Sequence, residues 1–460
     1  MTKVFTDSRL KKIKLLGIPF LFSVAIAALF YPGFMSYDTL HALQGARDGV
    51  TDSMWPPMVS YVWRVVDLVS DNPSAMHFSQ VFLLLLSVFY IVFMFTKKIS
   101  HALMFMLLYL SLPTVLGTLA VIWKDVLMAA LFMAGFSVII YIKNTKNLGI
   151  VNNSSYQATR LVFLSLLALI FLFTGVCSRH NAITGALPLI FFLAWVLCSR
   201  RGKTKRHVFF SALFLGATLT GAIYFTKVQL DHYSLPDFVK MNSSTDDFLQ
   251  SVRVLDIAGA SLCTKQNLFD SIAPNMSLMD IQRLYEPKHI NLSSGLLSEI
   301  GYNGAHKDLR IDKLWLNIAV HHPLCFFYNK AQLTKYLIGA HAGAPFIITA
   351  PSVDSNVYGY QLAESALRDS VVTYIINASQ HCFFKPWFIY LLSIGAFLYL
   401  MQRKSFRLEY SVLALSALLY FVSLVMFGNA ADARLSFYTT TVLFMLTFIA
   451  LGQLFCSLRK

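Results

Sequence analysis

The sequence predicts an all-α polytopic membrane protein with about ten transmembrane helices and a mostly α-helical extracytoplasmic insert. Of its 460 residues, 56% are hydrophobic and 13% are charged, whereas soluble chains average about 25% charged residues. Several segments reach the roughly 17–25 apolar residues that an α-helix needs to cross a bilayer. The formal net charge of +15 is the second informative observation, because its placement along the chain predicts the topology.

Ten segments are long and apolar enough to be predicted as membrane spans. An even number of spans puts both termini on the same side of the membrane. We expect the spans at residues 15–32, 77–96, 101–120, 126–142, 161–178, 182–198, 208–226, 386–402, 409–427 and 437–456.

The charge distribution predicts that the termini are cytoplasmic. With that assignment, the cytoplasmic segments hold 20 of the 38 basic residues and only two acids, Asp7 and Glu409, so their balance is +18 and the rest of the chain carries −3. An excess of Lys and Arg in cytoplasmic loops is the positive-inside pattern of membrane proteins. The basic composition is therefore explained by topology and predicts no nucleic-acid partner.

Two outer segments are too long to be simple connections. They divide the chain into an N-terminal transmembrane module at 1–226 with about seven helices, a soluble extracytoplasmic domain at 227–385, and a C-terminal module at 386–460 with about three helices. The other long segment is the first outer loop, at 32–76. The remaining outer connections are short.

The first outer loop carries a carboxylate that is a candidate base. Pro32 and Gly33 break the first helix, and Asp38 follows shortly after them. At the bilayer surface, desolvation would raise the pKa of this carboxyl group and suit it to accept a proton. The alternative is that Ser36 and Asp38 cap a short helix.

Three basic side chains at three different hairpin ends face the same side as this carboxylate. Lys124, Arg179 and Arg434 could converge on one anionic group, such as a lipid phosphate, through charge-assisted hydrogen bonds. The alternative is snorkelling or local ion pairing, of Lys124 with Asp125 and of Arg434 with Asp432.

The sequence offers no strong metal or nucleotide motif. Its histidines come without an HExxH pattern, its six cysteines form no CxxC pair, and there is no Walker, GxSxG or Rossmann motif in context. We therefore expect no cofactor, and a divalent metal has no support. Cys263, Cys325 and Cys382 lie outside, so one disulfide among them and three unreactive thiols both remain open. Trp55 is a candidate for stacking on a sugar ring, or else part of an interfacial belt.

The order of five short strings resembles the GT-C superfamily of integral-membrane glycosyltransferases. It is also similar to the phage- or island-encoded transferases that decorate O-antigen with glucose. The resemblance covers most of the chain in layout but only short strings in sequence. These strings are Tyr31-Pro-Gly-Phe-Met-Ser-Tyr-Asp38-Thr, Trp55-Pro-Pro57, Ile122-Trp-Lys-Asp125, Ser178-Arg-His-Asn181 and Ala431-Asp-Ala-Arg434.

The resemblance implies a fold, substrates and roles for the site residues. A polyprenyl-phosphate-linked sugar would be the donor, a cell-surface glycan such as the O-antigen of lipopolysaccharide the acceptor, and the bacterial inner membrane the location, with a periplasmic active site. Asp38 would act as the base of an inverting displacement, and the three basic residues would bind the donor phosphate, with support from His180, Asp432 and Trp55. The resemblance also implies a second acidic residue, for which three candidates compete: Asp48, Asp52 and Asp125. The acidic pair common in the first loop of the family is absent here, so no metal bridge is implied.

Two other classes of function remain open. A transferase of acyl or phosphoryl groups onto surface glycans would need a histidine base or a supported nucleophile, and His180 is the one well-placed candidate. A transporter or flippase for lipid-linked sugars would carry polar residues in the middle of its spans. The predicted spans are almost free of such residues, which disfavours transport.

Overall fold

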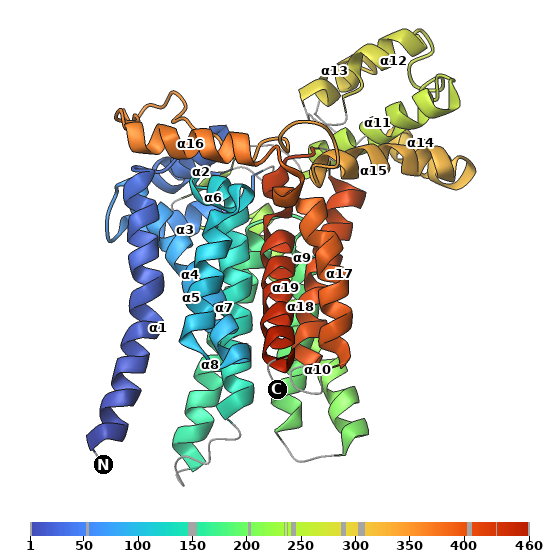
Figure 1. Ribbon diagram of the computed structural model, residues 1–460. Helices are drawn as coiled ribbons and strands as arrows, with labels where there is room; N and C mark the ends of the chain where they lie inside the picture. The colour runs from blue at the N-terminus through green and yellow to red at the C-terminus, as the bar shows by residue number, and fades with distance from the viewer. Residues whose placement is uncertain are drawn as a thin grey trace.

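The computed structural model describes most of the chain as one helical bundle with an attached insert (Figure 1). Asp52 and Lys146 are among the residues outside the described part. The described residues are 2–51, 55–145, 154–200, 204–233, 235–236, 238–240, 245–286, 291–301, 309–402, 407–428 and 430–458.

Long apolar helices run side by side and form the bundle, as the all-α prediction requires (Figure 1). Both chain termini lie at one end of the bundle, which we call the termini end; the opposite end, which carries α2, α3, α16 and the insert, is the insert end. The bundle helices are α1 (Thr2–Leu29), α4 (Pro73–Thr96), α5 (Ile99–Ser111), α6 (Pro113–Leu119), α7 (Lys124–Thr145), α8 (Ser154–Cys177), α9 (Ala182–Ser199), α10 (Lys205–His232), α17 (Pro386–Gln402), α18 (Arg407–Phe427) and α19 (Phe437–Leu458).

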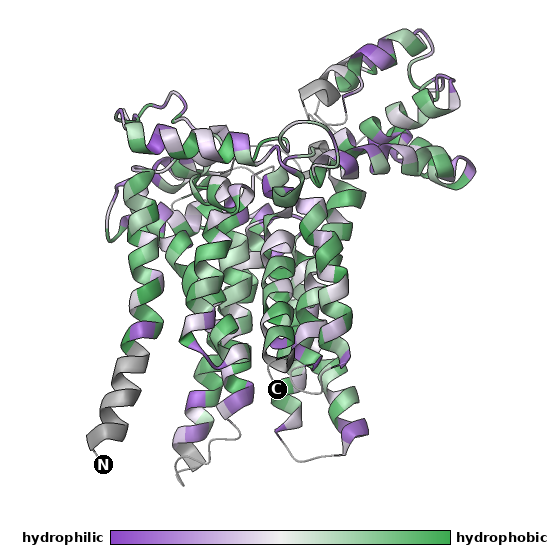
Figure 2. Ribbon diagram, viewed as in Figure 1, coloured by the Kyte–Doolittle hydropathy of each residue, from purple (hydrophilic) through white to green (hydrophobic). Residues whose placement is uncertain are grey.

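Seven helices of the described chain are long and apolar enough to cross a membrane. Figure 2 shows that most of their residues are hydrophobic and that hydrophilic residues gather towards the two ends of the bundle. An eighth candidate span, α5 with α6, is bent by 82°. The bend lies at Leu112, which is extended (φ −71°, ψ 120°) because it precedes Pro113. Two shorter apolar helices, Ile13–Leu29 and Pro386–Gln402, fall in the other predicted spans. The chain is thus a multi-pass membrane protein, and the count of ten remains a prediction.

Short elements close the insert end of the bundle. α2 (Tyr37–Asp48) and α3 (Met58–Asp67) belong to the first outer loop. Strand β1 (Val50–Thr51) pairs in parallel with β2 (Val239–Lys240), which is the one sheet of the described residues. α16 (Ala366–Ala378) lies across this end of the bundle (Figure 1).

The insert has its own hydrophobic core. Val254, Ile257, Phe269, Ile281 and Ile311 are buried within it. The disulfide Cys263–Cys325 joins its first and last helices, which resolves the choice among the three outer cysteines, with Cys382 left free. The helices are α11 (Thr245–Thr264), α12 (Leu278–Leu284), α13 (Asn291–Glu299), α14 (Leu309–His321) and α15 (Pro323–Leu337).

A buried ion pair joins the insert to the bundle. Lys330 of α15 pairs with Asp256 of α11 at 2.8 Å, and its Nζ also donates to the carbonyl oxygen of Met426 at 2.7 Å, near the end of α18. Leu333 and Leu337, further along α15, are buried in the hydrophobic core of the bundle. The end of α15 is therefore fixed at the insert end of the membrane helices.

Gly33 allows the chain to turn from α1 into α2. Its φ is +104°, and a Cβ at this position would lie 2.9 Å from the Ile122 side chain and 3.2 Å from the His77 ring. A side chain here meets both an unfavourable backbone conformation and a packed core.

We predict that Gly33→Ala lowers the free energy of unfolding by about 1–2 kcal/mol or more, the cost of placing a side chain at positive φ. Thermal unfolding of the purified chain in detergent measures this effect. Gly221→Ala is the matched control, because it lies in α10 with nothing within 4 Å of the added Cβ. Equal behaviour of the two variants would contradict the argument.

Candidate functional site

Asp38 lies in the first turn of α2, at the insert end of the bundle. After Gly33, Phe34 pairs with the segment that precedes α7: its N–H donates to Ala120 O and its carbonyl accepts from Ile122 N–H, both at 3.0 Å. This pairing places the start of α2 beside the start of α7. Asp38 and Lys124 are brought together by backbone hydrogen bonds, although they are far apart in the sequence.

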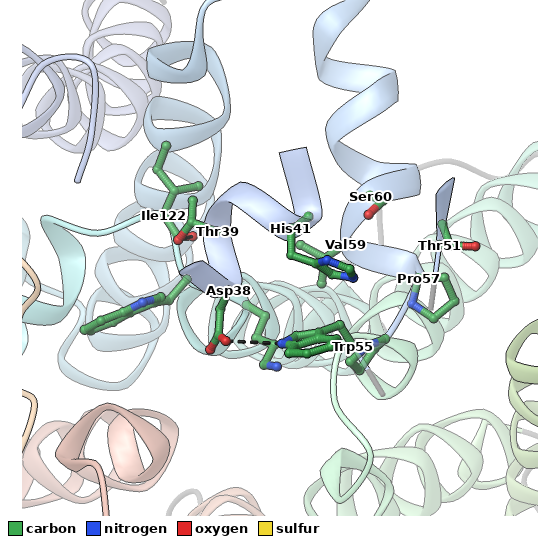
Figure 3. A pocket seen from close by; sticks show the side chains of 13 residues that line it. Asp38, Thr39, His41, Thr51, Trp55, Pro57, Val59, Ser60 and Ile122 are labelled. Atoms are coloured by element: carbon green, nitrogen blue, oxygen red, sulfur yellow. Dashed lines mark hydrogen bonds between the residues drawn. The ribbon is translucent and has the colours of Figure 1, made fainter. Parts of the chain in front are cut away.

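An arginine from the other end of the chain binds Asp38. Nη2 of Arg434 donates to Asp38 Oδ2 at 2.8 Å, and its Nε donates to Asp432 Oδ2 at 3.1 Å. Trp55 Nε1 donates to the second oxygen of Asp38 at 3.2 Å (Figure 3). One cation thus bridges two carboxylates, and both Asp38 oxygens have a donor.

The guanidinium of Arg434 rests on an aromatic ring. Its Cζ lies 4.6 Å from the ring centroid of Trp123, within the range of a cation–π interaction. Trp123 is buried and its Nε1 donates to Ser36 Oγ at 3.0 Å. Arg434 Nη1 is buried and has no hydrogen-bond partner among the described residues.

Lys124 adds a second positive charge next to Asp38. It lines the same cavity as Asp38, and its electrostatic neighbours are Asp38, Arg179 and Arg434. Within the described part of the chain, its ammonium group makes no hydrogen bond or ion pair. Two cations therefore have donors to spare at this place, one on Lys124 and one on Arg434.

Arg179 is paired with Asp125, which is almost completely buried. The local pairs expected as the alternative are thus partly present: Arg434 pairs with Asp432, but Asp125 pairs with Arg179 and not with Lys124. All three predicted cations nevertheless lie in one electrostatic cluster with Asp38 and Asp432.

The expectation of a raised pKa for Asp38 is wrong. Burial does act to raise it, but Lys124, Arg434 and the hydrogen bonds from Trp55 and Arg434 outweigh burial and hold the pKa well below its usual range. Burial raises the pKa of Asp432, which Arg434 offsets only in part. Asp38 is therefore an ionised carboxylate whose proton affinity depends on what its cations bind.

The segment 346–360, which we call the strap, forms backbone hydrogen bonds with the two segments that carry Asp38 and Arg434. Phe346 O accepts from Ala433 N at 2.7 Å, next to Arg434. Met35, next to the start of α2, donates to Ser352 O at 3.0 Å and accepts from Asp354 N at 2.9 Å.

Further along, the strap packs on α2. The guanidinium of Arg47 lies 5.0 Å from the ring centroid of Tyr358 and 5.4 Å from that of Tyr360, and it donates to Tyr360 Oη at 3.0 Å. The strap thus fixes α2 against the loop that carries Arg434.

A small cavity opens beside Asp38, between α2, α3 and the start of α7 (Figure 3). Its volume is about 20 Å³, room for about one water molecule. On one side the rings of Trp55 and His41 are in contact, 4.5 Å apart, and the Tyr37 ring lies 5.8 Å from that of Trp55. The aromatic side chains next to the carboxylate are suited to stack on a sugar, but a sugar needs a wider opening.

The other predicted residues lie as follows. Asp48 is at the far end of α2, where it accepts a hydrogen bond from Tyr358 Oη at 3.2 Å. Asp52 lies outside the described residues. His180 is in the turn between α8 and α9, next to Arg179. Of the acidic residues that are described, Asp432 is the one that shares a cation with Asp38.

The alternative of helix capping is not supported for Ser36, whose side chain makes no capping hydrogen bond. The sequence reasoning missed Trp123 as a support for Arg434, although it adjoins Lys124 in a string that had been singled out. It also missed the strap, which carries no charged or motif-like signal at Phe346 or Ser352.

The described residues contain no group of three or more His, Cys, Asp or Glu side chains that could hold a metal ion.

Comparison with known protein families, with curated proteins and with solved structures finds no match to this chain. The site must therefore be interpreted from its own chemistry: an ionised carboxylate between two cations that have donors to spare.

We predict that Arg434→Met lowers the free energy of unfolding at pH 7 by about 3–5 kcal/mol, because it leaves the buried Asp432 and the partly buried Asp38 without their shared cation. Loss of the cation raises the pKa of both carboxyl groups, so protonation relieves the penalty, and the difference from the wild type should narrow as the pH falls from about 7 to about 5. In the wild type, the lowered pKa of Asp38 keeps its stabilising contribution intact above the ordinary carboxyl pKa.

Thermal unfolding in detergent across this pH range measures the effect. Arg283→Met is the control, since the Arg283 side chain is 68% exposed. A difference from the wild type that stays constant with pH would mean that the two carboxylates are not what Arg434 stabilises.

Proposed function

We propose that this chain is a membrane glycosyltransferase of the GT-C type, which moves a sugar from a polyprenyl-phosphate donor onto a cell-surface glycan such as O-antigen. One observation carries the proposal: Asp38 lies between Arg434 and Lys124, and each of these cations has a donor that no described residue accepts. A carboxylate next to two cations with unused donors, at the end of a membrane bundle, suits a reaction between a hydroxyl group and a lipid-linked phosphate.

The topology belongs to the same proposal. We propose ten spans, comprising the seven long helices, the bent pair and the two shorter apolar helices. With the termini in the cytoplasm, the insert end faces the periplasm of a bacterial inner membrane. The Cys263–Cys325 disulfide supports this orientation, because disulfides persist in oxidising compartments.

The reaction is a single displacement with inversion at the anomeric carbon. Asp38 accepts the proton of the acceptor hydroxyl, whose oxygen forms a bond to the anomeric carbon. The bond from that carbon to the phosphate oxygen breaks, and the electron pair stays on the polyprenyl phosphate. Arg434 and Lys124 stabilise the charge that grows on this leaving group.

Donor binding also prepares the base. The donor phosphate competes with Asp38 for Arg434, since both are anions that bind its guanidinium. When the phosphate takes Arg434, Asp38 keeps Lys124 nearby but loses one of the two cations that hold its pKa low. The carboxylate becomes a stronger base only when a donor is bound.

We predict that Asp38→Asn abolishes sugar transfer, because the amide keeps the shape of the side chain but cannot accept the proton. Sugar composition and linkage analysis of surface polysaccharide, from cells with no copy, the wild type or the variant, measures this. Asp48→Asn is the matched control on the same helix and should keep activity. A new branch residue that appears with Asp38→Asn as with the wild type would exclude Asp38 as the base. An added acyl or phosphoryl group in place of a sugar would exclude glycosyl transfer.

We predict that Lys124→Met reduces kcat/KM for the donor about 10- to 100-fold, the effect of losing one charge-assisted hydrogen bond of about 1.5–3 kcal/mol. The KM for the acceptor should change little, because Lys124 binds the donor phosphate. Transfer from a radiolabelled polyprenyl-phosphate sugar in membrane vesicles separates the two constants. Equal losses for donor and acceptor would argue against a phosphate role.

A further inference from the structure

An exposed apolar stripe runs along the two insert helices that lie nearest the bundle. We name it the outer stripe, and it consists of Leu316 and Val320 of α14 and Leu324, Phe327 and Tyr328 of α15. Leu324 is 87% exposed, Val320 71% and Leu316 56%. Phe327 is 54% exposed and Tyr328 41%. Exposed apolar residues that are contiguous mark a surface that another phase or molecule contacts.

The helical pattern separates this stripe from the faces that hold the insert together. In α15, Leu324, Phe327 and Tyr328 are followed on the same face by Ala331 and Lys335, which are exposed as well. The opposite side of α15 is buried: Phe326 packs on Trp315, and Asn329 hydrogen-bonds to Asp256 of α11. The stripe is therefore the outward side of an amphipathic pair, and the core of the insert does not need it.

The position of the stripe points to its partner. α15 is tied to the last turn of the membrane helix α18 through Lys330 and Met426, and Leu333 and Leu337 enter the core of the bundle. In Figure 1, α14 and α15 extend sideways from that point, at the level where the membrane helices end, while α12 and α13 lie further away. An apolar surface that extends laterally at this level meets the bilayer next to the bundle.

The charges of the same segment favour an anionic surface. No Asp or Glu occurs between Lys313 and Val353, whereas Lys313, His321, His322 and Lys335 flank the stripe. The whole outer segment 227–385 holds 14 acidic and 13 basic residues. The acidic residues all lie outside the stretch from Lys313 to Val353, so the charged residues of this stretch are all basic. Interfacial helices combine an apolar face with Lys and Arg at its margin, and they bind anionic lipids more strongly than neutral ones.

We propose that the outer stripe of α14 and α15 rests on the membrane surface beside the bundle, with its side chains among the lipid chains and Lys313 and Lys335 at anionic lipid headgroups. The bilayer then supports the insert along its length. The contact anchors α15, whose last turns pack on the bundle and contact the 3₁₀ turn Ala433–Ser436 that contains Arg434. This proposal depends on the membrane location of the chain and not on the reaction that it performs.

The test uses the full chain in nanodiscs that hold one copy each, with an environment-sensitive fluorophore on an introduced cysteine. The exposed Cys382 is first replaced by Ser, and labelling of this parent measures the background from Cys177 and Cys198. Leu324→Cys reports on the stripe. Met279→Cys is the matched control, because Met279 is 79% exposed on α12, at the far side of the insert.

We expect the label at Leu324→Cys to emit at shorter wavelength and to lose intensity when the nanodisc contains doxyl-labelled phosphatidylcholine. The label at Met279→Cys should show neither effect. A label at Leu324→Cys that behaves like the control would overturn the proposal. A shift to shorter wavelength without quenching by doxyl lipid would also overturn it, because protein would then cover the stripe.

A second comparison tests the headgroup preference. Quenching at Leu324→Cys should be stronger in nanodiscs with phosphatidylglycerol than in phosphatidylcholine alone, and the double substitution Lys313→Gln with Lys335→Gln should remove this difference. Equal quenching in both lipid compositions before the lysines are changed would overturn the role of the two lysines.

Discussion

The ion pair between Asp38 and Arg434 is the interaction on which the arrangement of the insert end depends. It joins the first turn of α2 to the loop that precedes α19, so segments from the two ends of the chain meet at this contact. A carboxylate that is largely buried is tolerated only when a cation or several hydrogen bonds compensate for the lost water. Asp38 has both, and Asp432 depends on the same guanidinium. Displacing Arg434 would therefore change two carboxylates at once.

The strap holds the two segments that carry this ion pair in place relative to each other. It bonds to Ala433 on one side and to Met35 on the other, and it belongs to the outer segment between the two modules. The segment 227–385 thus has two parts with different roles. The helices α11–α15 have their own core and disulfide, whereas the strap and α16 lie over the bundle. A movement of α15 relative to the bundle would reach the site through the strap, which follows α15 in the chain.

The sequence predicts the position of Asp38 well because local chemistry decides it. Pro32 and Gly33 end the first helix, and a charged residue just beyond the span must lie at the membrane surface. The common side of Lys124, Arg179 and Arg434 follows from the count of spans in the same way. Which acid pairs with which base could not be predicted, since Asp125 lies next to Lys124 in the sequence but pairs with Arg179 across a helix contact.

The features that sequence reasoning missed depend on long-range packing. The strap forms backbone hydrogen bonds, which any residue can make, so its role leaves no mark in the side chains of Phe346 or Ser352. The segment 101–120 was expected as one span, but it bends by 82° between α5 and α6, and α6 packs against α16 and α19. The pKa of Asp38 was predicted in the wrong direction, because burial was considered without the cations that accompany it.

The charged groups around Asp38 explain why its two oxygens are already occupied. Three cations and three carboxylates gather here, and among the described residues nothing accepts from the ammonium group of Lys124 or from one nitrogen of Arg434. An arriving phosphate finds two donors, but to use Arg434 fully it must compete with Asp38. An acceptor hydroxyl finds an ionised carboxylate that is already engaged by Arg434 and Trp55, and a cavity of only about 20 Å³. In the proposed reaction, the anionic ligand therefore binds first and releases the base. In the proposed reaction, water that enters before the donor meets a carboxylate of low basicity, because both cations still act on Asp38.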